Sequence, residues 1–499
     1  MLRSVAARTT RGCSRLSAQA PRLASPAPAA LVRALSSTPH RLASSGRKPL
    51  HHSLVPEQTQ PCPTIIQSRE PKTALHLQMN PKSQTHISYM WLRDHCREER
   101  SYHPKTKQRL VDTYKIPPDI KPDAVEAKEE GLYVTWPKSD FESSYTSFYP
   151  WSFLVEHAYN PPLVAKTRDI RTRKTHWTAA IKGRMPTQVT YEQVMDSEKG
   201  VYEWLKLIDT YGFAFVSGVP HTPEATEQLI RRIAFIRETH YGGFWDFTAN
   251  LEHGDLAYSE VKLEGHTDTT YFTDPCGLQL FHLLSDPSTH TGGQNLLIDG
   301  FRAAHLLKLR HPNDYEFLAH VPTPSHASGS GSASSPSGVH MRPMKQEPLF
   351  IHNETGELVQ VRWNMDDRGA LGGHGMHGRK MEKWYKAMRE WERILRNPES
   401  QLWTQMEPGT AIIFDNHRVL HGRSAFSGTR RLCGAYISGD DYRSRLRGLE
   451  KQFGSVTDKS VYHLERKVVN DAMRRHGVKH TKKEAVDEAK REVWGEYLS

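Results

Sequence analysis

The chain has 499 residues, of which 37% are hydrophobic and 25% charged, enough apolar material for one large core and a smaller one. Its net charge of +11 is concentrated at one end: residues 1–50 carry nine basic residues and no acidic one, so the rest of the chain sums to about +2. That near balance excludes an argument for nucleic-acid binding from bulk charge. No run approaches ~18 apolar residues, so we expect no transmembrane helix.

The five cysteines are Cys13, Cys62, Cys96, Cys276 and Cys433. They are odd in number and widely scattered, and none forms a CxxC pair. This pattern indicates neither a disulfide framework nor a zinc or redox site of the CxxC type. A reducing compartment such as the mitochondrial matrix fits it.

Residues 1–50 are rich in Arg, Ser and Ala, and the first acidic residue of the chain is Glu57. This composition is typical of a mitochondrial transit peptide that is removed after import. A basic tail without a targeting role is the alternative. Residues 51–81 are polar and rich in Pro and Gln, so we predict a linker there.

Residues 82–150 are predicted to form a small β-rich domain. Ile87–Leu92 and Leu132–Trp136 have the composition of strands, and the second alternates apolar and polar residues. An irregular, basic connector follows.

A larger domain is predicted over residues 185–445. It begins with a helix over about Tyr191–Asp209 and a strand over Gly212–Gly218, and Thr222 followed by Pro223 marks the start of a second helix. Five further strands are predicted, at Leu278–Leu284, Asn295–Asp299, Leu358–Trp363, Thr410–Phe414 and Arg431–Ile437. Many short strands with few helices predict a mainly β barrel or sandwich with flanking helices.

Two low-complexity segments interrupt this domain, and a charged tail follows it. The Gly/Ser-rich residues 325–338 are predicted to be a disordered surface insertion. The Gly- and His-rich residues 372–378 are interpreted as a flexible loop rather than a metal site. The tail over 446–499 has a helical pattern after Thr481, which fits either a helix on a partner surface or a solvated tail.

A possible metal site is indicated by His266 and Asp268, which lie two residues apart on a segment expected to be extended. His417 and His421 follow about 150 residues later. Two imidazoles and one carboxylate form the facial triad of non-haem Fe(II) oxygenases, which leaves positions open for a co-substrate and dioxygen. Spacing alone does not choose between the two distal histidines. We prefer His421 because Gly-Arg follows it and it lies nine residues before Arg430.

Arg430 stands at the start of a predicted strand. A co-substrate that chelates iron through one end needs a cation for the carboxylate at its other end. A guanidinium can bind that carboxylate through two parallel hydrogen bonds. Arg430 is therefore the candidate co-substrate residue.

Aromatic residues precede the His-x-Asp pair, at Tyr241, Phe244, Trp245, Phe247 and Tyr258. Aromatic faces that converge on a pocket can bind a quaternary ammonium group by cation–π attraction, worth roughly 0.5–2 kcal/mol per face. From the residues alone, packing in a core is the alternative and the commoner role.

Three motifs occur together and in order: Trp91-Leu-Arg-Asp-His-Cys96, His266-Thr-Asp-Thr-Thr-Tyr-Phe272 and Asp415-Asn-His-Arg-Val-Leu-His-Gly-Arg423. In them the chain resembles the γ-butyrobetaine dioxygenase family of Fe(II)/2-oxoglutarate-dependent oxygenases, from about Ile87 to Asp441. The resemblance implies a double-stranded β-helix (jelly-roll) catalytic domain, Fe(II) as cofactor, 2-oxoglutarate and dioxygen as co-substrates, and ascorbate to keep the iron reduced.

The resemblance also implies roles for individual residues. His266, Asp268 and His421 would be the catalytic metal ligands, and Arg430 would bind 2-oxoglutarate. Asn295 falls where many relatives carry a Thr near the co-substrate. The residues implied for an ammonium cage are Tyr241, Trp245, Tyr258 and Tyr436.

Within the family, the chain is similar to members that hydroxylate free N6-trimethyllysine at carbon 3, the first step of carnitine biosynthesis. Hydroxylation of γ-butyrobetaine by the same chemistry is one alternative, and a non-catalytic jelly-roll protein that binds quaternary ammonium groups is another. No nucleic-acid or membrane partner is expected, and the resemblance implies a homodimer.

In one respect the chain departs from its relatives. Their small domain binds a structural zinc through several Cys and one His, whereas only Cys96 stands at a matching position here, and Ser101 and Asp140 replace expected ligands. One thiolate cannot form a tetrahedral zinc site. We therefore predict that structural zinc is absent.

Overall fold

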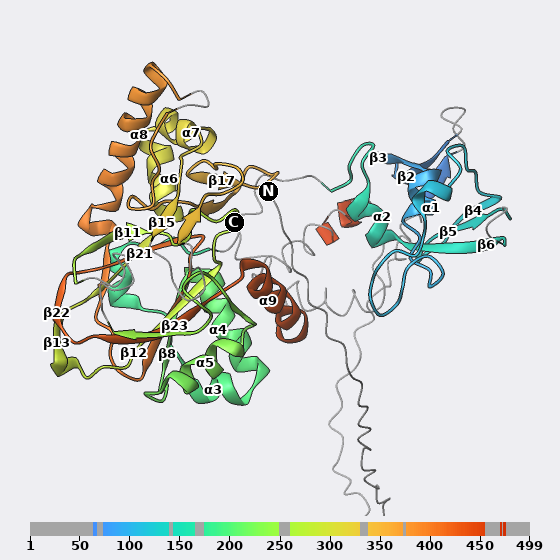
Figure 1. Cartoon of the computed structure of the whole chain (residues 1–499). Coiled ribbons are helices and arrows are strands. Elements are labelled where there is room, and N and C mark those ends of the chain that lie inside the picture. Colours follow the sequence, from blue (N-terminus) through green and yellow to red (C-terminus); the bar gives the residue numbers. More distant parts are fainter. Residues whose placement is uncertain are drawn as a thin grey trace, which may run out of the picture. The chain divides into compact units, whose positions relative to one another are not determined.

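The structure is a computed structural model (Figure 1) that describes residues 63–66, 73–138, 143–164, 174–248, 260–329, 338–372, 376–454, 470–471 and 473–475. The predicted transit peptide, Tyr258, Asp140 and the predicted helix after Thr481 lie outside these ranges. Within them, no helix combines the length and the hydropathy that crossing a bilayer requires.

The larger of the two main sheets in the part after residue 174 has seven strands in the order β10-β23-β12-β20-β8-β7, with β9 beside β23. Their bounds are β7 Val189–Thr190, β8 Phe213–Ser217, β9 Ile236–Arg237, β10 Trp245–Thr248, β12 Leu278–Leu283, β20 Thr410–Asp415 and β23 Arg431–Ile437. Every pair is antiparallel except β7 with β8. The strands predicted over 212–218, 278–284, 410–414 and 431–437 are therefore present with small shifts of their ends.

A second antiparallel sheet has the order β11-β21-β14-β19. Its strands are β11 Leu263–His266, β14 Asn295–Asp299, β19 Leu402–Thr404 and β21 Val419–Arg423. Three two-stranded sheets accompany them: β13 His290–Gly292 with β22 Phe426–Gly428, β15 Ala327–Gly329 with β16 Val339–Met341, and β17 Phe350–His352 with β18 Leu358–Val361. Two mainly antiparallel sheets agree with the jelly-roll architecture expected for this part of the chain.

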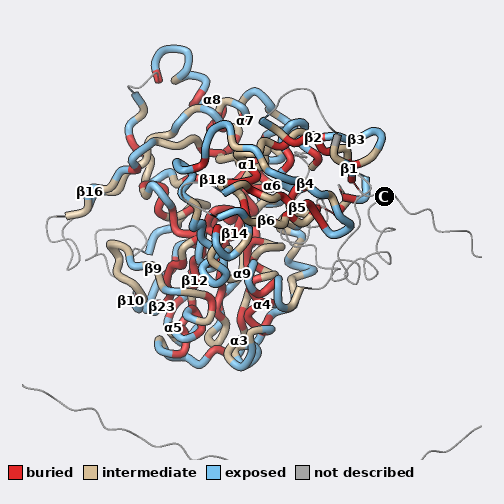
Figure 2. Tube along the Cα trace, turned by 90° about the vertical axis from the view of Figure 1, so that its right-hand side faces the viewer, coloured by how far each residue is buried: buried red, intermediate tan, exposed pale blue. Residues whose placement is uncertain are grey.

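Helices cover one face of each sheet. Helices α3 Tyr191–Asp196, α4 Glu198–Tyr211, α5 Pro223–Arg231 and α9 Gly439–Phe453 share one apolar cluster with the larger sheet. Helices α6 Gly300–Arg310, α7 Pro312–His320 and α8 Arg379–Leu395 share another with the smaller sheet. Because side chains alternate along a strand, Leu280 faces the first cluster and Gln279 and Phe281 face the other way. Buried residues follow β12, β14 and β23 (Figure 2).

Local signals explain where these helices begin. Thr190 and Gln193 form a reciprocal capping box at the start of α3, and the Thr222 hydroxyl accepts from the Ala225 amide at the start of α5. Gly212, with φ of 81°, ends α4 in the left-handed conformation. The helix predicted over 191–209 is thus divided in two at Ser197, which caps α4.

The N-terminal part contains two three-stranded antiparallel sheets, β1-β2-β3 and β4-β5-β6. Its elements are β1 Thr64–Ile66, β2 Ala74–Asn80, β3 Ser83–Ser88, α1 Tyr89–Asp94, β4 Ala124–Ala127, β5 Gly131–Trp136, β6 Tyr145–Pro150 and α2 Trp151–His157. They enclose one apolar cluster, which also takes in Met473 from near the C-terminus. The side-chain amide of Asn80 donates to the Arg475 carbonyl at 2.9 Å, so this C-terminal segment is tied to the N-terminal sheets.

Two predictions for the N-terminal part were wrong. The strand predicted over Ile87–Leu92 is instead the end of β3 followed by α1, because the helical turn buries Leu92 completely and lets the Tyr149 hydroxyl donate to its carbonyl. The linker predicted over 51–81 contains β1 and β2. Its signal was the alternation of Leu75, Leu77 and Met79, which are all buried.

Two boundaries in the larger part also differ from prediction. Part of the segment predicted to be disordered over 325–338 forms β15, because its backbone pairs with β16 and the Ser325 hydroxyl donates to the Thr270 carbonyl at 2.8 Å. The tail predicted from residue 446 begins inside α9. Leu446 and Leu449 on that helix are buried against the larger sheet, so the helix belongs to its core.

Candidate active site

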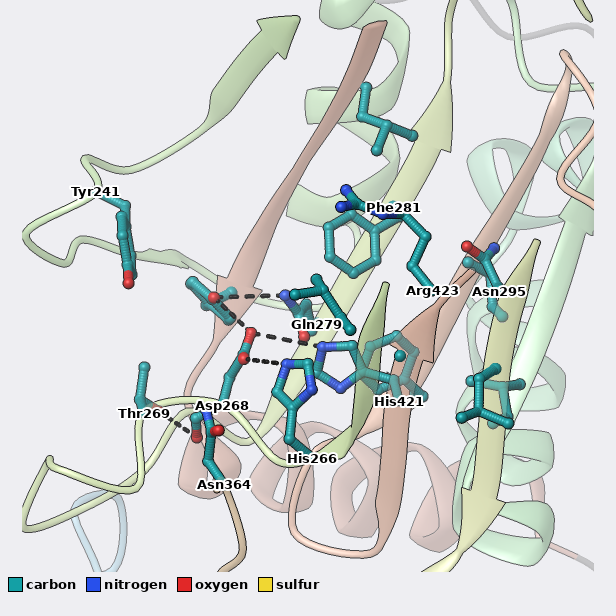
Figure 3. Close-up of a pocket in the computed structure, with 18 of the residues that line it drawn as sticks. Tyr241, His266, Asp268, Thr269, Gln279, Phe281, Asn295, Asn364, His421 and Arg423 are labelled. Atoms are coloured by element: carbon teal, nitrogen blue, oxygen red, sulfur yellow. Dashed lines mark hydrogen bonds and ion pairs between the residues drawn. The ribbon is translucent and has the colours of Figure 1, made fainter. Parts of the chain in front are cut away.

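Three side chains converge where β11 meets β21. The register pairs His266 with His421 on these neighbouring strands, and Asp268 follows two residues after His266. His266 Nε2 lies 3.3 Å from Asp268 Oδ1, and His421 Nε2 lies 3.7 Å from Asp268 Oδ2. One ligand atom from each residue fits within 4.8 Å of the others (Figure 3). These are the three residues that the sequence singled out as metal ligands.

His417 lies outside this group. Its ring is buried, its Nε2 donates to the Pro275 carbonyl at 3.2 Å, and its Nδ1 accepts from the Arg443 guanidinium at 3.1 Å. Both ring nitrogens therefore have partners in the protein. The structure thus brings His421, and not His417, to His266 and Asp268.

The charges at the three side chains are strongly coupled. Burial opposes a charge on His266, but the hydrogen bond and charge of Asp268 raise its pKa to about 9. Burial and the neighbouring charge of His266 lower the pKa of His421 to about 3. Burial would raise the pKa of Asp268, yet the charges of His421 and His266 hold it well below its usual range. The carboxylate is therefore ionised beside one neutral imidazole.

The backbone around Asp268 is fixed by Asn416. Its Oδ1 accepts from the Asp268 amide at 2.7 Å, and its Nδ2 donates to the carbonyls of Asp268 at 3.0 Å and Cys276 at 2.8 Å. The next residue, Thr269, has a φ of 56°, which is rare for a β-branched residue. The Thr269 hydroxyl stabilises this conformation by accepting from the Cys276 amide at 2.9 Å. Asp268 therefore has a fixed position at the start of a constrained turn.

The opposite end of the pocket contains Arg430 and Asn295. Arg430 is only 3% exposed, and within the described ranges its Nε has no hydrogen-bond partner and no acidic residue pairs with it. Burial, together with the charge of Arg423, lowers its pKa to about 10. The Asn295 side-chain Nδ2 is also buried without a partner there. Figure 3 places Asn295 and Arg423 on the side of His421 away from Asp268.

Aromatic side chains form a wall of the same pocket. Tyr241, Trp245 and Tyr436 line it, so three of the four predicted cage residues lie together. The rings of Trp245 and Tyr436 meet edge to face with centroids 5.7 Å apart. Trp245 lies against Gly434, where an added Cβ would come within 2.4 Å of the indole ring. The absence of a side chain at position 434 therefore makes room for Trp245.

The prediction from sequence missed several residues that line the pocket, and also Asn416, which holds the backbone of Asp268. The lining residues that it missed include Tyr271, Gln279, Phe281, Asn364, Asp366, Asp367 and Arg423. Some of them carried a signal. Tyr271, Asn416 and Arg423 lie inside the motifs, and Gln279 is a polar residue in an otherwise apolar predicted strand. Asn364, Asp366 and Asp367 follow β18 in a loop where no motif or unexpected residue type singles them out.

The sequence profile described as "Taurine catabolism dioxygenase TauD, TfdA family" matches residues 171–436 of the chain. This span includes every residue of the pocket and more than half of the chain. The chain belongs to the TauD/TfdA family of dioxygenases. A second profile, "Gamma-butyrobetaine hydroxylase-like, N-terminal", matches residues 66–155, which hold β2 to β6 of the two N-terminal sheets.

Curated relatives of this TauD/TfdA-family dioxygenase extend the match over most of its length. It is 42% identical to the trimethyllysine dioxygenase of Neurospora crassa, over 76% of this chain and 85% of the relative. It is 36% identical to the mitochondrial trimethyllysine dioxygenase of Homo sapiens, over 73% and 83%. The γ-butyrobetaine dioxygenase of a Pseudomonas species is 28% identical, over 72% and 90%.

The position where relatives were expected to bind structural zinc contains other interactions. Cys96 is buried, with its Sγ 3.0 Å from the Ser147 hydroxyl, and the Arg93 guanidinium donates to the Ser101 hydroxyl at 3.5 Å. The absence of zinc stays a prediction, and one mole of zinc per chain in purified protein would contradict it.

Proposed function

We propose that this dioxygenase hydroxylates free trimethyllysine at carbon 3 and so performs the first step of carnitine biosynthesis. The observation that carries the proposal is the convergence of His266, Asp268 and His421 in a pocket that also contains Arg430 and an aromatic wall. The greater identity to trimethyllysine dioxygenases than to the bacterial γ-butyrobetaine dioxygenase supports this choice of substrate.

The donor set fits Fe(II). Two imidazoles and one carboxylate are the ligands of non-haem iron oxygenases, and a divalent cation among them would take the place of the shared proton on His266. The His266 Nδ1–H donates to the Glu264 carbonyl at 2.7 Å, which directs Nε2 toward the metal position. Bound iron would supply the redox chemistry that couples decarboxylation of 2-oxoglutarate to hydroxylation of a C–H bond.

Arg430 would bind 2-oxoglutarate through the carboxylate that does not reach the metal. Its buried guanidinium lacks an acidic partner in the described part of the chain, so an anionic ligand would satisfy its charge and its hydrogen bonds. The unpaired Nδ2 of Asn295 could donate to the same ligand.

Tyr241, Trp245 and Tyr436 would hold the trimethylammonium group, and Tyr258 remains a predicted fourth member of the cage. A quaternary ammonium has no N–H to donate, so aromatic faces rather than hydrogen bonds suit it. By binding one end of the substrate, these rings would determine which carbon lies beside the metal. The position of the substrate in turn determines which C–H bond reacts.

The experiment that tests this function measures succinate. The full chain is loaded with Fe(II) without oxygen and then exposed to oxygen with 2-oxoglutarate and either trimethyllysine or γ-butyrobetaine. We expect succinate release with trimethyllysine. Succinate release with γ-butyrobetaine alone would support the proposed iron chemistry but show that γ-butyrobetaine, and not trimethyllysine, is the substrate. No release with either would favour a non-catalytic ammonium-binding protein.

Four further expectations belong to this proposal. Residues 1–50 would direct the enzyme to the mitochondrial matrix, as the names of the vertebrate relatives suggest. The N-terminal sheets would form a small domain distinct from the catalytic one. Ascorbate would keep the iron reduced, and the enzyme would form a homodimer.

A further inference from the structure

Tyr436 differs from the other aromatic residues of the pocket in what its hydroxyl does. The side chain is 5% exposed, and its hydroxyl donates to Asp268 Oδ2 at 2.7 Å. Its ring meanwhile packs against Trp245 on the wall of the pocket. One residue on β23 thus touches both the place proposed for the ammonium group and a proposed metal ligand.

Gln279 fixes the direction of this hydrogen bond. β12 and β23 pair Gln279 with Tyr436, and the side chain of Gln279 is only 2% exposed. Its Nε2 donates to the Tyr436 oxygen at 3.4 Å. A phenol has one proton to donate. Because the Tyr436 oxygen accepts from the Gln279 amide, the phenol proton is free to be donated to the Asp268 carboxylate. In Figure 3, Gln279 lies between Asp268 on one side and Arg423 and Asn295 on the other.

Tyr241 provides the contrast. It lines the same pocket, but its hydroxyl lies 3.2 Å from that of Tyr271, which belongs to the same sequence motif as His266 and Asp268. No hydrogen bond joins Tyr241 to Asp268 among the described contacts. Tyr241 and Tyr436 therefore line the same pocket, but of the two only Tyr436 hydrogen-bonds to the Asp268 carboxylate among the described contacts.

We propose that Tyr436 is a positioning residue for the metal, with its hydroxyl oriented by Gln279 so that it holds the Asp268 carboxylate in place. The inference rests on the proposed function only in taking Asp268 as a metal ligand. Asn416 holds the backbone of Asp268 and Tyr436 holds its side chain, so the carboxylate is oriented before the metal binds. Partners of this kind typically change metal affinity about 10- to 100-fold.

The test compares Tyr436→Phe with the matched control Tyr241→Phe, by titrating Mn(II) into the full-length protein and following the free ion by electron paramagnetic resonance. We expect Tyr436→Phe to weaken Mn(II) binding about 10-fold or more and Tyr241→Phe to leave it within about 3-fold. Each variant removes one hydroxyl and keeps a ring, so a general loss of packing would affect both alike. Equal affinities for the two variants would overturn the proposal.

Gln279→Leu gives a second, independent readout if Tyr436→Phe does not fold. It removes the amide that orients the phenol, and we expect a loss of Mn(II) affinity smaller than that of Tyr436→Phe; an unchanged affinity would contradict the role of Gln279. The titration uses neither 2-oxoglutarate nor trimethyllysine, so a wrong substrate would not alter it. A wild-type protein that binds no Mn(II) would overturn both this inference and the proposed metal site.

Discussion

Asp268 at one end of the pocket and Arg430 at the other differ in whether other residues of the protein hydrogen-bond to their charged groups. At the metal end, the Asp268 carboxylate accepts a hydrogen bond from the Tyr436 hydroxyl. The backbone amide and carbonyl of Asp268 both bond to the Asn416 side chain. At the other end, the Arg430 Nε and the Asn295 Nδ2 have no partner among the described residues. Arg430 is 3% exposed and the Asp268 side chain is 18% exposed, so the group without protein partners is also the one less accessible to solvent.

This contrast indicates what each end requires. Ligands of a metal must be held in place beforehand, because a carboxylate that rotates costs affinity. Groups that bind a co-substrate must instead be left unpaired, since a carboxylate from the chain would compete with the ligand. A buried group without a partner lowers stability by about 1–3 kcal/mol, which the bound ligand would restore. The predictions below test the two ends separately.

The largest effect is expected at the metal end from His421→Ala. Loss of a direct ligand should lower Mn(II) affinity and turnover by more than about 100-fold, beyond the range typical of indirect partners. His417→Ala is the matched control, because its ring hydrogen-bonds to Pro275 and Arg443 instead. Its Mn(II) affinity should stay within about 3-fold, and a reversed order of the two variants would make His417 the ligand.

A smaller effect is expected from Asn416→Ala. It removes three hydrogen bonds and leaves the part-buried amide of Asp268 without this partner, so the protein without metal should lose about 2 kcal/mol or more in urea unfolding. Mn(II) affinity should fall with it. Asn397→Ala, which removes only a cap at a short surface helix, should cost ~1 kcal/mol and leave Mn(II) binding unchanged.

The smallest effect is expected at the co-substrate end from Asn295→Ala. The Asn295 Nδ2 has no partner to lose, and relief of this unpaired group offsets the packing lost with the side chain, so stability without ligand should change by less than about 0.5 kcal/mol. The KM for 2-oxoglutarate should rise about 2- to 10-fold, as for one hydrogen bond. A large loss of stability with an unchanged KM would mean that Asn295 serves the fold rather than the ligand.

Local periodicity predicted many of the elements that frame the pocket. The strands β12, β14, β20 and β23 were read from apolar runs between turns, and the start of α5 from Thr222 and Pro223. The helices α6 to α8 were missed, although Trp384, Ala387, Met388 and Trp391 on α8 repeat at helical spacing and are buried.

The sequence predicted the proposed metal and co-substrate residues but not the side chains that hold them, and the reason is physical. Residue type and spacing were enough to single out His266, Asp268 and Arg430, because metal and carboxylate chemistry restricts which side chains can serve. They favoured His421 over His417 without excluding His417. The link from Gln279 through Tyr436 to Asp268 depends on the register of β12 against β23, which is a contact between residues 157 positions apart. No local pattern in one sequence encodes that register.

Thermal unfolding of Arg430→Met, with saturating Mn(II) and with or without 2-oxoglutarate, tests the contrast most directly. An apolar side chain in place of a buried, unpaired guanidinium should raise stability without 2-oxoglutarate by about 1–2 kcal/mol. At a concentration ~100 times its dissociation constant, 2-oxoglutarate should stabilise the wild type by about 2.7 kcal/mol and the variant by much less. A variant that is less stable than the wild type and still stabilised by 2-oxoglutarate would contradict the assignment of Arg430 to the co-substrate.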